Sequence, residues 1–189
     1  MKYDMPDNHG LSKSVFQNLV FKEAGRPTLS DVQFSALKAG VGRGESLLVV
    51  SPTSTGKTQI ALWAIAKSLE SGHHTVYLVT HRALAKQKFE DFKSQLLNNY
   101  LDGDAASLVV ATGDYVEDAD EQPPADPLRA PLLVATYEKY LALLSACLAL
   151  RVGYDADAIS VFLAGRPSVR VRNDMNVAFL AHGKSPLTG

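Results

Sequence analysis

The residues most suited to chemistry are Ser-Pro-Thr-Ser-Thr-Gly-Lys-Thr at positions 51–58. Gly56 has no Cβ atom, so the backbone there can adopt a positive φ and lie close to phosphate oxygens. The ammonium group of Lys57 suits the β- and γ-phosphates of a nucleotide, and the hydroxyl group of Thr58 suits Mg²⁺. The segment therefore predicts a nucleotide-binding loop, with Lys57 and Thr58 as catalytic residues and Thr58 as the magnesium ligand. The other nucleotide contacts expected from this loop are Thr53, Ser54, Thr55 and Gly56.

The loop departs from the general phosphate-loop pattern at its first position. That pattern, G-x-x-x-x-G-K-[ST], begins with glycine, whereas this chain has Ser51. The alternative is a chance Gly-Lys-Thr sequence at the start of a helix. The flanks favour a phosphate loop, because they predict a buried strand over 47–50 and a helix over 59–70. Such a strand, loop and helix direct backbone N–H groups and the positive end of the helix dipole to one point.

Strand and helix patterns alternate along the rest of the chain. Apolar runs predict further strands over 75–79, 108–112 and 132–135, and one more over 159–163. Apolar residues at helical spacing predict helices over 12–23, 30–38, 82–96 and 137–148. This alternation predicts an α/β fold, a doubly wound parallel sheet with helices on both faces and its ligand at the carboxyl ends of the strands.

Three connecting segments carry more specific expectations. Gly25 is expected to end the first helix, and residues 26–28 are expected to form a turn. Ser30 is expected to cap the helix that carries Gln33. Residues 114–126 contain six acidic residues and no basic one, so we expect a solvated loop without secondary structure.

The composition limits the classes of protein to consider. The chain has 189 residues, 46% hydrophobic and 21% charged, as expected for one soluble globular domain. Its formal net charge of −1 excludes a global basic field, so any nucleic-acid binding must be local. The single cysteine, Cys147, excludes an internal disulfide and a cysteine zinc site and favours a reducing, cytoplasmic setting. The sequence has neither a signal-peptide pattern nor an apolar run of membrane-spanning length, so we expect no membrane association.

Four parts of the sequence, in this order, resemble a known family. They are Pro27-Thr28 with Gln33, the loop at 51–58, Val-Thr-His-Arg-Ala-Leu-Ala-Lys-Gln at 79–87, and Thr-Gly-Asp at 112–114 together with Val-Ala-Thr-Tyr-Glu-Lys at 134–139. Together they resemble the first, ATP-binding motor domain of superfamily 2 helicases of the DEAD/DEAH type, and the last stretch especially resembles the Ski2-like branch. The loop of that family is commonly Ala-Pro-Thr-x-x-Gly-Lys-Thr, which accounts for Ser51 where a glycine would be expected.

The resemblance implies a P-loop NTPase domain with the RecA-like fold. It implies ATP and Mg²⁺ as cofactors, adenine contacted by Gln33, and a single strand of DNA or RNA held through its backbone. The implied nucleic-acid contacts are Arg82, Gly113, Thr136 and Tyr137. Residues at successive strand ends form one edge of a sheet, where polar groups and backbone N–H donors can line a phosphate backbone. Two alternatives stay open, a surface ion pair for Arg82 and a helix N-cap for Thr136.

The chain also departs from the family. The next family motif is a strand that ends in Asp-Glu, whose Asp holds Mg²⁺ and whose Glu activates water, but no Asp-Glu pair follows Lys139. The nearest acidic cluster, Asp155 and Asp157, contains no glutamate. The second motor domain, with its arginine finger, is missing too. We therefore expect a truncated helicase that binds ATP and does not turn it over efficiently without a second motor domain or partner subunit.

The expected organisation is a helical lead-in at 1–25, the ATP-binding motor domain at 26–150, and a divergent or poorly ordered tail at 151–189. One other function stays open, a non-catalytic regulatory or interaction module that keeps the motor fold. A P-loop kinase or transferase has less support, because such an enzyme needs a substrate lid and an acidic residue at a strand end. Neither is evident in the sequence.

Overall fold

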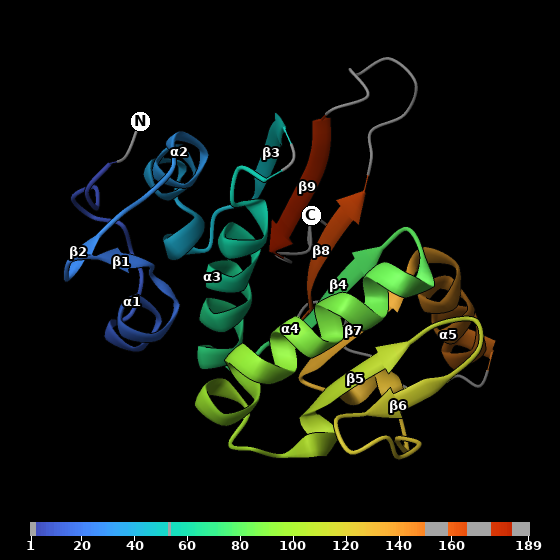
Figure 1. The fold of residues 1–189 in the computed structure, drawn as a ribbon. Coiled ribbons are helices and arrows are strands. Elements are labelled where there is room, and N and C mark those ends of the chain that lie inside the picture. Colours follow the sequence, from blue (N-terminus) through green and yellow to red (C-terminus); the bar gives the residue numbers. More distant parts are fainter. Residues whose placement is uncertain (1–2, 53, 150–158, 166–174, 183–189) are drawn as a thin grey trace, which may run out of the picture.

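A seven-stranded sheet forms the centre of the protein in this computed structural model (Figure 1). The structure describes residues 3–52, 54–149, 159–165 and 175–182, and it describes side chains up to residue 146. The strands are β3 (Leu47–Pro52), β4 (His74–Val79), β5 (Leu108–Ala111), β6 (Val116–Asp118), β7 (Leu132–Thr136), β8 (Ile159–Gly165) and β9 (Met175–His182). Their order across the sheet is β3-β9-β8-β4-β7-β5-β6.

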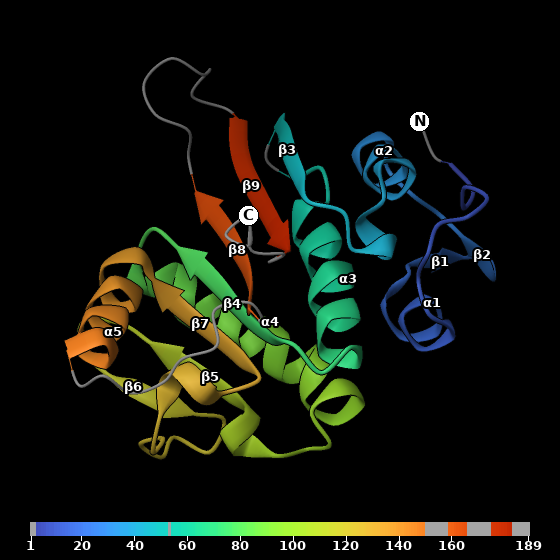
Figure 2. The ribbon, with the colours of Figure 1, turned by 180° about the vertical axis from the view of Figure 1, so that it is seen from behind.

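Helices cover both faces of this sheet (Figures 1 and 2). They are α1 (Lys13–Leu19), α2 (Asp31–Ala39), α3 (Lys57–Glu70), α4 (Arg82–Tyr100) and α5 (Tyr137–Ala149), with short 3₁₀ turns at Val41–Arg43, Ala105–Ser107 and Pro127–Arg129. One face is covered by α3 and α4, with α1 and α2 packed against α3, and α5 covers the other face at β4 and β7. The predicted α/β fold with helices on both faces is confirmed.

The central strands β4, β5 and β7 have no solvent-exposed face, because both of their faces are buried. In β4, Tyr77 and Val79 belong to the core under α3 and α4, whereas Val76 and Leu78 belong to the core under α5. Successive side chains of a strand point to opposite faces, so each face receives every second residue. This double burial explains why the sequence of these three strands shows continuous apolar runs instead of alternation. The prediction that the strand over 47–50 is buried was wrong for one of its faces, because Leu48 and Val50 of β3 are 63% and 45% exposed.

The predicted parallel sheet is in fact mixed. β4, β5, β7 and β8 run parallel to one another, whereas β6 and β9 run antiparallel to their neighbours. Because β9 is antiparallel to both β3 and β8, β3 points in the same direction as β4. The carboxyl ends of β3, β4, β5 and β7 therefore meet at one edge of the sheet, as the parallel arrangement predicted.

The acidic segment at 114–126 contains a strand, contrary to the prediction of a loop without secondary structure. β6 pairs antiparallel with β5, and Glu117 lies opposite Val110. Asp118 is buried, and its carboxylate accepts hydrogen bonds from the backbone N–H groups of Asp120 and Gln122, both at 2.9 Å. An edge strand has one side open to solvent and so tolerates charged residues, which is why the charge pattern misled the prediction.

The N-terminal helix is shorter than predicted. α1 ends at Leu19 instead of continuing to residue 23, and residues 22–27 form a small hairpin of β1 (Lys22–Glu23) and β2 (Arg26–Pro27). Gly25 has a φ of +79° in the turn of this hairpin and does not cap α1. The carbonyl oxygen of Leu19 accepts a hydrogen bond from the indole of Trp63 at 2.9 Å and another from the side chain of Gln59. These contacts with α3, which sequence periodicity cannot indicate, hold the carboxyl end of α1.

Some predictions concern residues beyond this description. Asp155 and Asp157 lie outside the described ranges, as does Thr53, and the side chain of Cys147 is not described either. The strand predicted over 159–163 is β8. The division of the chain into lead-in, motor domain and tail stays a prediction. Within the described ranges, no helix combines the length and the apolar character needed to cross a bilayer.

Candidate nucleotide-binding and nucleic-acid-binding sites

The predicted phosphate loop joins β3 to α3 and ends at the N-terminus of that helix. Gly56 is the N-cap of α3 and has a φ of +91°, a conformation that favours glycine. A Cβ atom at this position would lie 2.3 Å from Nε2 of Gln33, so no larger residue fits without displacing that side chain. The first backbone N–H groups of α3 have no acceptor within the helix and carry the positive end of its dipole. This helix start suits a phosphate group.

Lys57 is folded back onto the end of β3. Its Nζ atom donates hydrogen bonds to the carbonyl oxygen of Ser51 at 2.8 Å, to the hydroxyl oxygen of Ser51 at 3.2 Å, and to the carbonyl oxygen of Pro52. The hydroxyl group of Thr55 contacts that of Ser51 at 2.7 Å and donates to the carbonyl oxygen of Pro52 at 3.0 Å. The loop is thus closed around the ammonium group by its own polar atoms.

Burial lowers the pKa of Lys57 below the ordinary value of a lysine. Partial removal from water disfavours the charged form, and the partners of Nζ are neutral dipoles that compensate only in part. A bound phosphate would favour the charged form through its negative charge. Nucleotide binding is therefore expected to raise the pKa of Lys57.

Ser30 and Gln33 connect α2 to the loop. They form a capping box, in which Ser30 Oγ accepts from the N–H of Gln33 at 3.3 Å and Gln33 Oε1 accepts from the N–H of Ser30 at 3.0 Å. The same side chains reach the loop, because Ser30 Oγ donates to the carbonyl oxygen of Thr55 at 2.8 Å and Gln33 Nε2 donates to that of Gly56 at 3.5 Å. Gln33 thus lies beside the loop. The cap was predicted, but the bond between Ser30 and Thr55 was not.

Thr58 lies in the first turn of α3, half-buried and next to Lys57. Its hydroxyl group can supply one oxygen ligand, and Mg²⁺ in nucleotide sites takes most of its other ligands from phosphates and water. Among the described residues, no group of three or more His, Cys, Asp or Glu side chains could hold a metal ion. The Thr58 hydroxyl group fits a magnesium ion that arrives with a nucleotide, because it can add one oxygen to ligands from phosphate and water.

The predicted nucleic-acid contacts gather at the carboxyl ends of β4, β5 and β7. The register places Val79 of β4 beside Thr136 of β7, so these two strand ends are level. Arg82, Gly113 and Thr136 line one cleft of about 280 Å³. The other lining residues are Thr80, His81, Glu138 and Lys139. The structure thus brings three of the four predicted residues together in one cleft, which we call the strand-end cleft.

Both simpler roles considered for these residues occur in the structure. Arg82 forms an ion pair with Asp114, and the two side chains are 61% and 59% exposed. The hydroxyl oxygen of Thr136 accepts the N–H of Lys139 at 3.4 Å, an N-cap contact at the start of α5. An exposed ion pair contributes at most about 1 kcal/mol, so Arg82 can exchange Asp114 for a phosphate at low cost. Neither role excludes contact with nucleic acid.

Tyr137, the fourth predicted contact, is not among the described residues that line the strand-end cleft. Its ring packs on the core under α5, and this burial raises the pKa of its hydroxyl group. Asp114 had no predicted role of its own, although it belongs to the Thr-Gly-Asp stretch. The N–H groups of Asp114 and Tyr115 both donate to the buried Thr112 hydroxyl at 3.4 Å, which holds this turn at the sheet edge. The sequence indicated this role only through an acidic side chain three residues after the end of β5.

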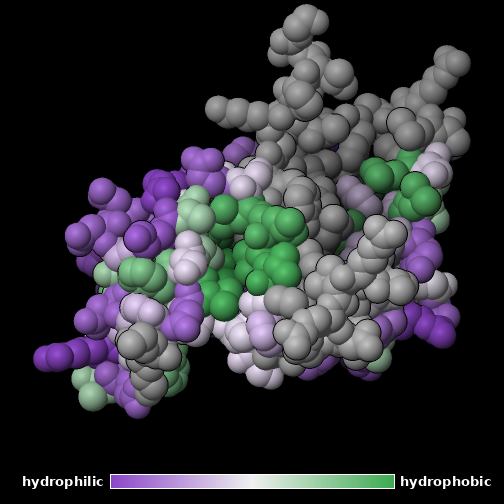
Figure 3. All heavy atoms as spheres, turned by 90° about the horizontal axis from the view of Figure 1, so that it is seen from above, coloured by the Kyte–Doolittle hydropathy of each residue, from purple (hydrophilic) through white to green (hydrophobic). Residues whose placement is uncertain are grey.

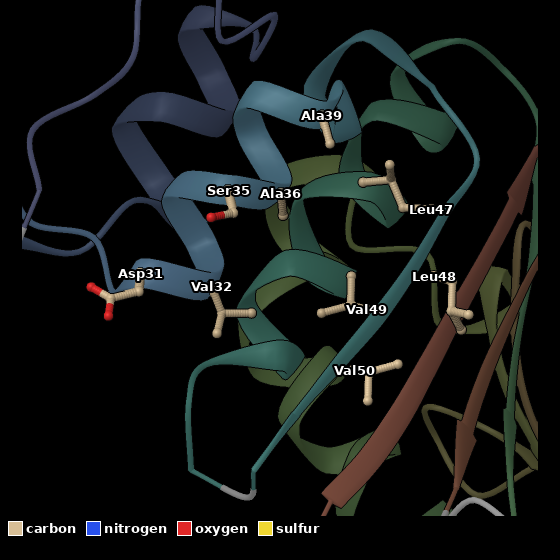
Figure 4. Close-up of a pocket in the computed structure, with 9 residues that line it drawn as sticks. All are labelled: Asp31, Val32, Ser35, Ala36, Ala39, Leu47, Leu48, Val49 and Val50. Carbon is tan, nitrogen blue, oxygen red and sulfur yellow. The ribbon is translucent and has the colours of Figure 1, made fainter.

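A separate apolar groove lies between α2 and β3 (Figure 4). It has a volume of about 350 Å³ and is lined by Asp31, Val32, Ser35, Ala36, Ala39, Leu47, Leu48, Val49 and Val50. Leu48 and Val50 are 63% and 45% exposed, and hydrophobic residues gather on the face that Figure 3 shows from above. None of these lining residues is a predicted site residue, so the groove is distinct from both candidate sites.

The strand ends thus carry, in chain order, a Gly-Lys-Thr loop, the arginine-bearing start of α4, a Thr-Gly-Asp turn and a threonine-capped helix. The sequence profile of the DEAD/DEAH box helicase family matches residues 30–159, more than half of the chain, and includes every predicted site residue. The chain belongs to this family. The predicted resemblance to DEAD/DEAH-type helicases is confirmed.

Individual relatives match only part of this chain. It is 39% identical over 124 residues to the ATP-dependent DNA helicase Hel308 of Aeropyrum pernix and 41% identical over 128 residues to the protein of the same name from Pyrococcus abyssi. These matches cover 65% and 66% of this chain and 15% and 16% of the two relatives. The chain is also 37% identical over 92 residues to the DExH-box ATP-dependent RNA helicase DExH9 of Arabidopsis thaliana, a match that covers 45% of this chain and 9% of that protein. The chain therefore spans a small part of the length of these relatives.

Proposed function

We propose that this chain is the first motor domain of an ATP-dependent helicase, which binds ATP with Mg²⁺ at the loop 51–58 and one nucleic-acid strand at the strand-end cleft. The observation that carries the proposal is the position of Lys57 and the start of α3 at the end of β3, with Gln33 hydrogen-bonded to the same loop. The names of the relatives support ATP as the nucleotide. They leave both DNA and RNA as candidate substrates.

Each residue has a distinct role in this proposal. Lys57 contacts the β- and γ-phosphates, Thr58 holds Mg²⁺, and Gln33 contacts adenine. Backbone N–H groups of the loop surround the phosphates, and they come from Thr53, Ser54, Thr55 and Gly56. Arg82, Gly113, Thr136 and Tyr137 contact the nucleic-acid backbone. A second motor domain or a partner subunit would complete the hydrolytic site.

Titration of the chain with a fluorescent ATP analogue in the presence of Mg²⁺ tests the nucleotide site. Lys57→Ala should weaken binding by about 10- to 100-fold, because it removes a charged hydrogen bond to phosphate. Lys67→Ala is the matched control, since Lys67 lies in the last turn of the same helix. Far-UV circular dichroism should show an unchanged fold in both variants. Undiminished ATP affinity in a folded Lys57→Ala variant would contradict the proposal.

The sequence also supports a second candidate, a module that binds its ligands without hydrolysing ATP. The observation behind it is that residues 140–189 contain no glutamate and so no Asp-Glu pair. The two candidates differ in ATP hydrolysis, which should be measured with and without single-stranded DNA and single-stranded RNA. Robust hydrolysis by this chain alone, stimulated by either nucleic acid, would exclude the module.

A further inference from the structure

Ser51 is an unusual residue for its position, because it is a buried polar side chain at the start of the phosphate loop. It is only 3% exposed. Its hydroxyl oxygen lies 2.7 Å from the hydroxyl oxygen of Thr55 and 3.2 Å from Nζ of Lys57. Because both of its partners are polar groups, this buried hydroxyl group belongs to a hydrogen-bond network.

The hydrogens available fix the direction of this network. The single hydroxyl hydrogen of Thr55 goes to the carbonyl oxygen of Pro52, at 3.0 Å. Ser51 must therefore be the donor to Thr55, and its oxygen accepts a hydrogen from the ammonium group of Lys57. The result is one directed chain from Lys57 through Ser51 and Thr55 to Pro52. We call it the hydroxyl relay, and bonds in such a chain strengthen one another.

The hydroxyl relay includes an N–H group of Lys57 that would otherwise be available to donate to a phosphate. An ammonium group has three hydrogens to donate, and all three of Lys57 are already used by two backbone carbonyl oxygens and the hydroxyl oxygen of Ser51. For Lys57 to contact a phosphate, at least one of these bonds must be given up. The two carbonyl oxygens belong to the backbone, so the Ser51 hydroxyl is the partner that depends on residue type.

We propose that Ser51 is a positioning residue that holds Lys57 against the end of β3 and thereby weakens the binding of nucleotides that carry a β-phosphate. This inference rests on the proposed function, because it concerns the same loop. If the inference holds, an alanine at position 51 lets the ammonium group of Lys57 bind a phosphate more readily. After the substitution, Thr55 keeps its bond to Pro52, Lys57 keeps its two carbonyl partners, and the third ammonium hydrogen becomes available to water or a phosphate. We therefore expect Ser51→Ala to fold.

The first experiment compares the affinities of the unmodified chain, Ser51→Ala and Ser51→Thr for ATP, ADP and AMP with Mg²⁺ present. Ser51→Ala should bind ATP and ADP about three- to tenfold more tightly, as expected for the loss of one competing hydrogen bond. AMP should bind the unmodified chain and Ser51→Ala equally, and Ser51→Thr, which keeps the hydroxyl group, should show no gain in ATP or ADP affinity. Unchanged or weaker ATP binding by Ser51→Ala, or an equal change for AMP, would overturn the inference.

A second experiment needs no nucleotide. Acetylation of lysines by a small reagent, followed by mass spectrometry, compares the reactivity of Lys57 with that of Lys67 as an internal reference. Ser51→Ala should increase the relative labelling of Lys57, because its amine is then less well held. Equal labelling in the two chains would count against the hydroxyl relay. If the unmodified chain binds no ATP but this labelling difference is found, the proposed function fails while the relay holds.

Discussion

The phosphate loop and the strand-end cleft lie at the same edge of the sheet but are built in different ways. The loop is tied to β3 and α2 by hydrogen bonds whose acceptors are mostly backbone carbonyl oxygens, with Lys57 and Ser30 among the donors. The strand-end cleft depends on side chains, and its main charged contact is an ion pair between Arg82 and Asp114 with both partners largely exposed. The loop should therefore be sensitive to geometry, and the cleft should respond gradually to charge and salt.

The largest effect is expected from Gly56→Ala. The new Cβ atom would lie 2.3 Å from Nε2 of Gln33, and the φ of +91° is unfavourable for alanine. ATP affinity should fall by about 30- to 100-fold and the free energy of unfolding by about 1–3 kcal/mol. Gly44→Ala is the matched control, because Gly44 has a φ of +85° and open space around it. This control should lower the free energy of unfolding without lowering ATP affinity. Equal ATP affinity in the two variants, measured by titration, would show that ATP binding does not depend on the backbone conformation at Gly56.

The next effect is a pH dependence of ATP binding. Since burial lowers the pKa of Lys57, the ammonium group should be lost at lower pH than in an exposed lysine, and ATP affinity should fall as pH rises through that pKa. Stability should change in the opposite direction, rising slightly over the same window, because the unfolded chain then binds more protons than the folded one. Titrations between neutral and alkaline pH test this, with Lys57→Ala as the control. The same fall in the control would assign the effect to another group.

A smaller effect is expected from Arg82→Ala at the strand-end cleft. Loss of one phosphate contact should weaken binding of single-stranded DNA or RNA by about five- to tenfold and make the dependence of log K on log salt shallower by about 0.7. Arg129→Ala is the matched control, because Arg129 is an exposed arginine that pairs with Asp126 at 3.2 Å and lies before β7, at the opposite end of that strand. Fluorescence anisotropy at several salt concentrations measures both. Equal losses in the two variants would indicate non-specific charge attraction.

The smallest effect is expected from Asp114→Asn. This substitution removes the carboxylate that competes with phosphate for Arg82, so single-stranded nucleic acid should bind about two- to threefold more tightly. The free energy of unfolding should change by less than about 1 kcal/mol, because the ion pair is exposed. Asp126→Asn serves as the control. Weaker binding by Asp114→Asn would show that the ion pair orients Arg82 for its ligand, and the cleft would then resemble the loop in its dependence on geometry.

Local patterns predicted the helices and the central strands well. The helix predicted over 82–96 from apolar residues at helical spacing is α4, and four of those residues, Ala85, Phe89, Phe92 and Leu96, are buried. Ser30 was predicted as a cap, and the structure adds the reciprocal bond from Gln33. These features depend on residues within a turn or two of one another, so the sequence contains the information directly.

Contacts between distant residues were predicted less well. The hairpin after α1, the strand β6 and the antiparallel β9 were missed, because each depends on a partner elsewhere in the fold. At the candidate sites, the sequence indicated residues that lie together at one edge of the sheet, but it did not indicate their hydrogen-bond and ion-pair partners. The bond from Ser30 to Thr55 and the ion pair of Arg82 with Asp114 join residues 25 and 32 positions apart.

By itself, the sequence determined the family, the alternation of strands and helices, and the loop whose residue types suit phosphate binding. These follow from residue type and short-range spacing. Only the tertiary structure showed that Lys57 is folded back onto Ser51 and that Asp114 forms an ion pair with Arg82. It also showed that Arg82, Gly113 and Thr136 line one cleft. The physical reason is that a hydrogen-bond donor or a charged group can pair only with partners that lie close to it in space, and only the fold determines which partners those are.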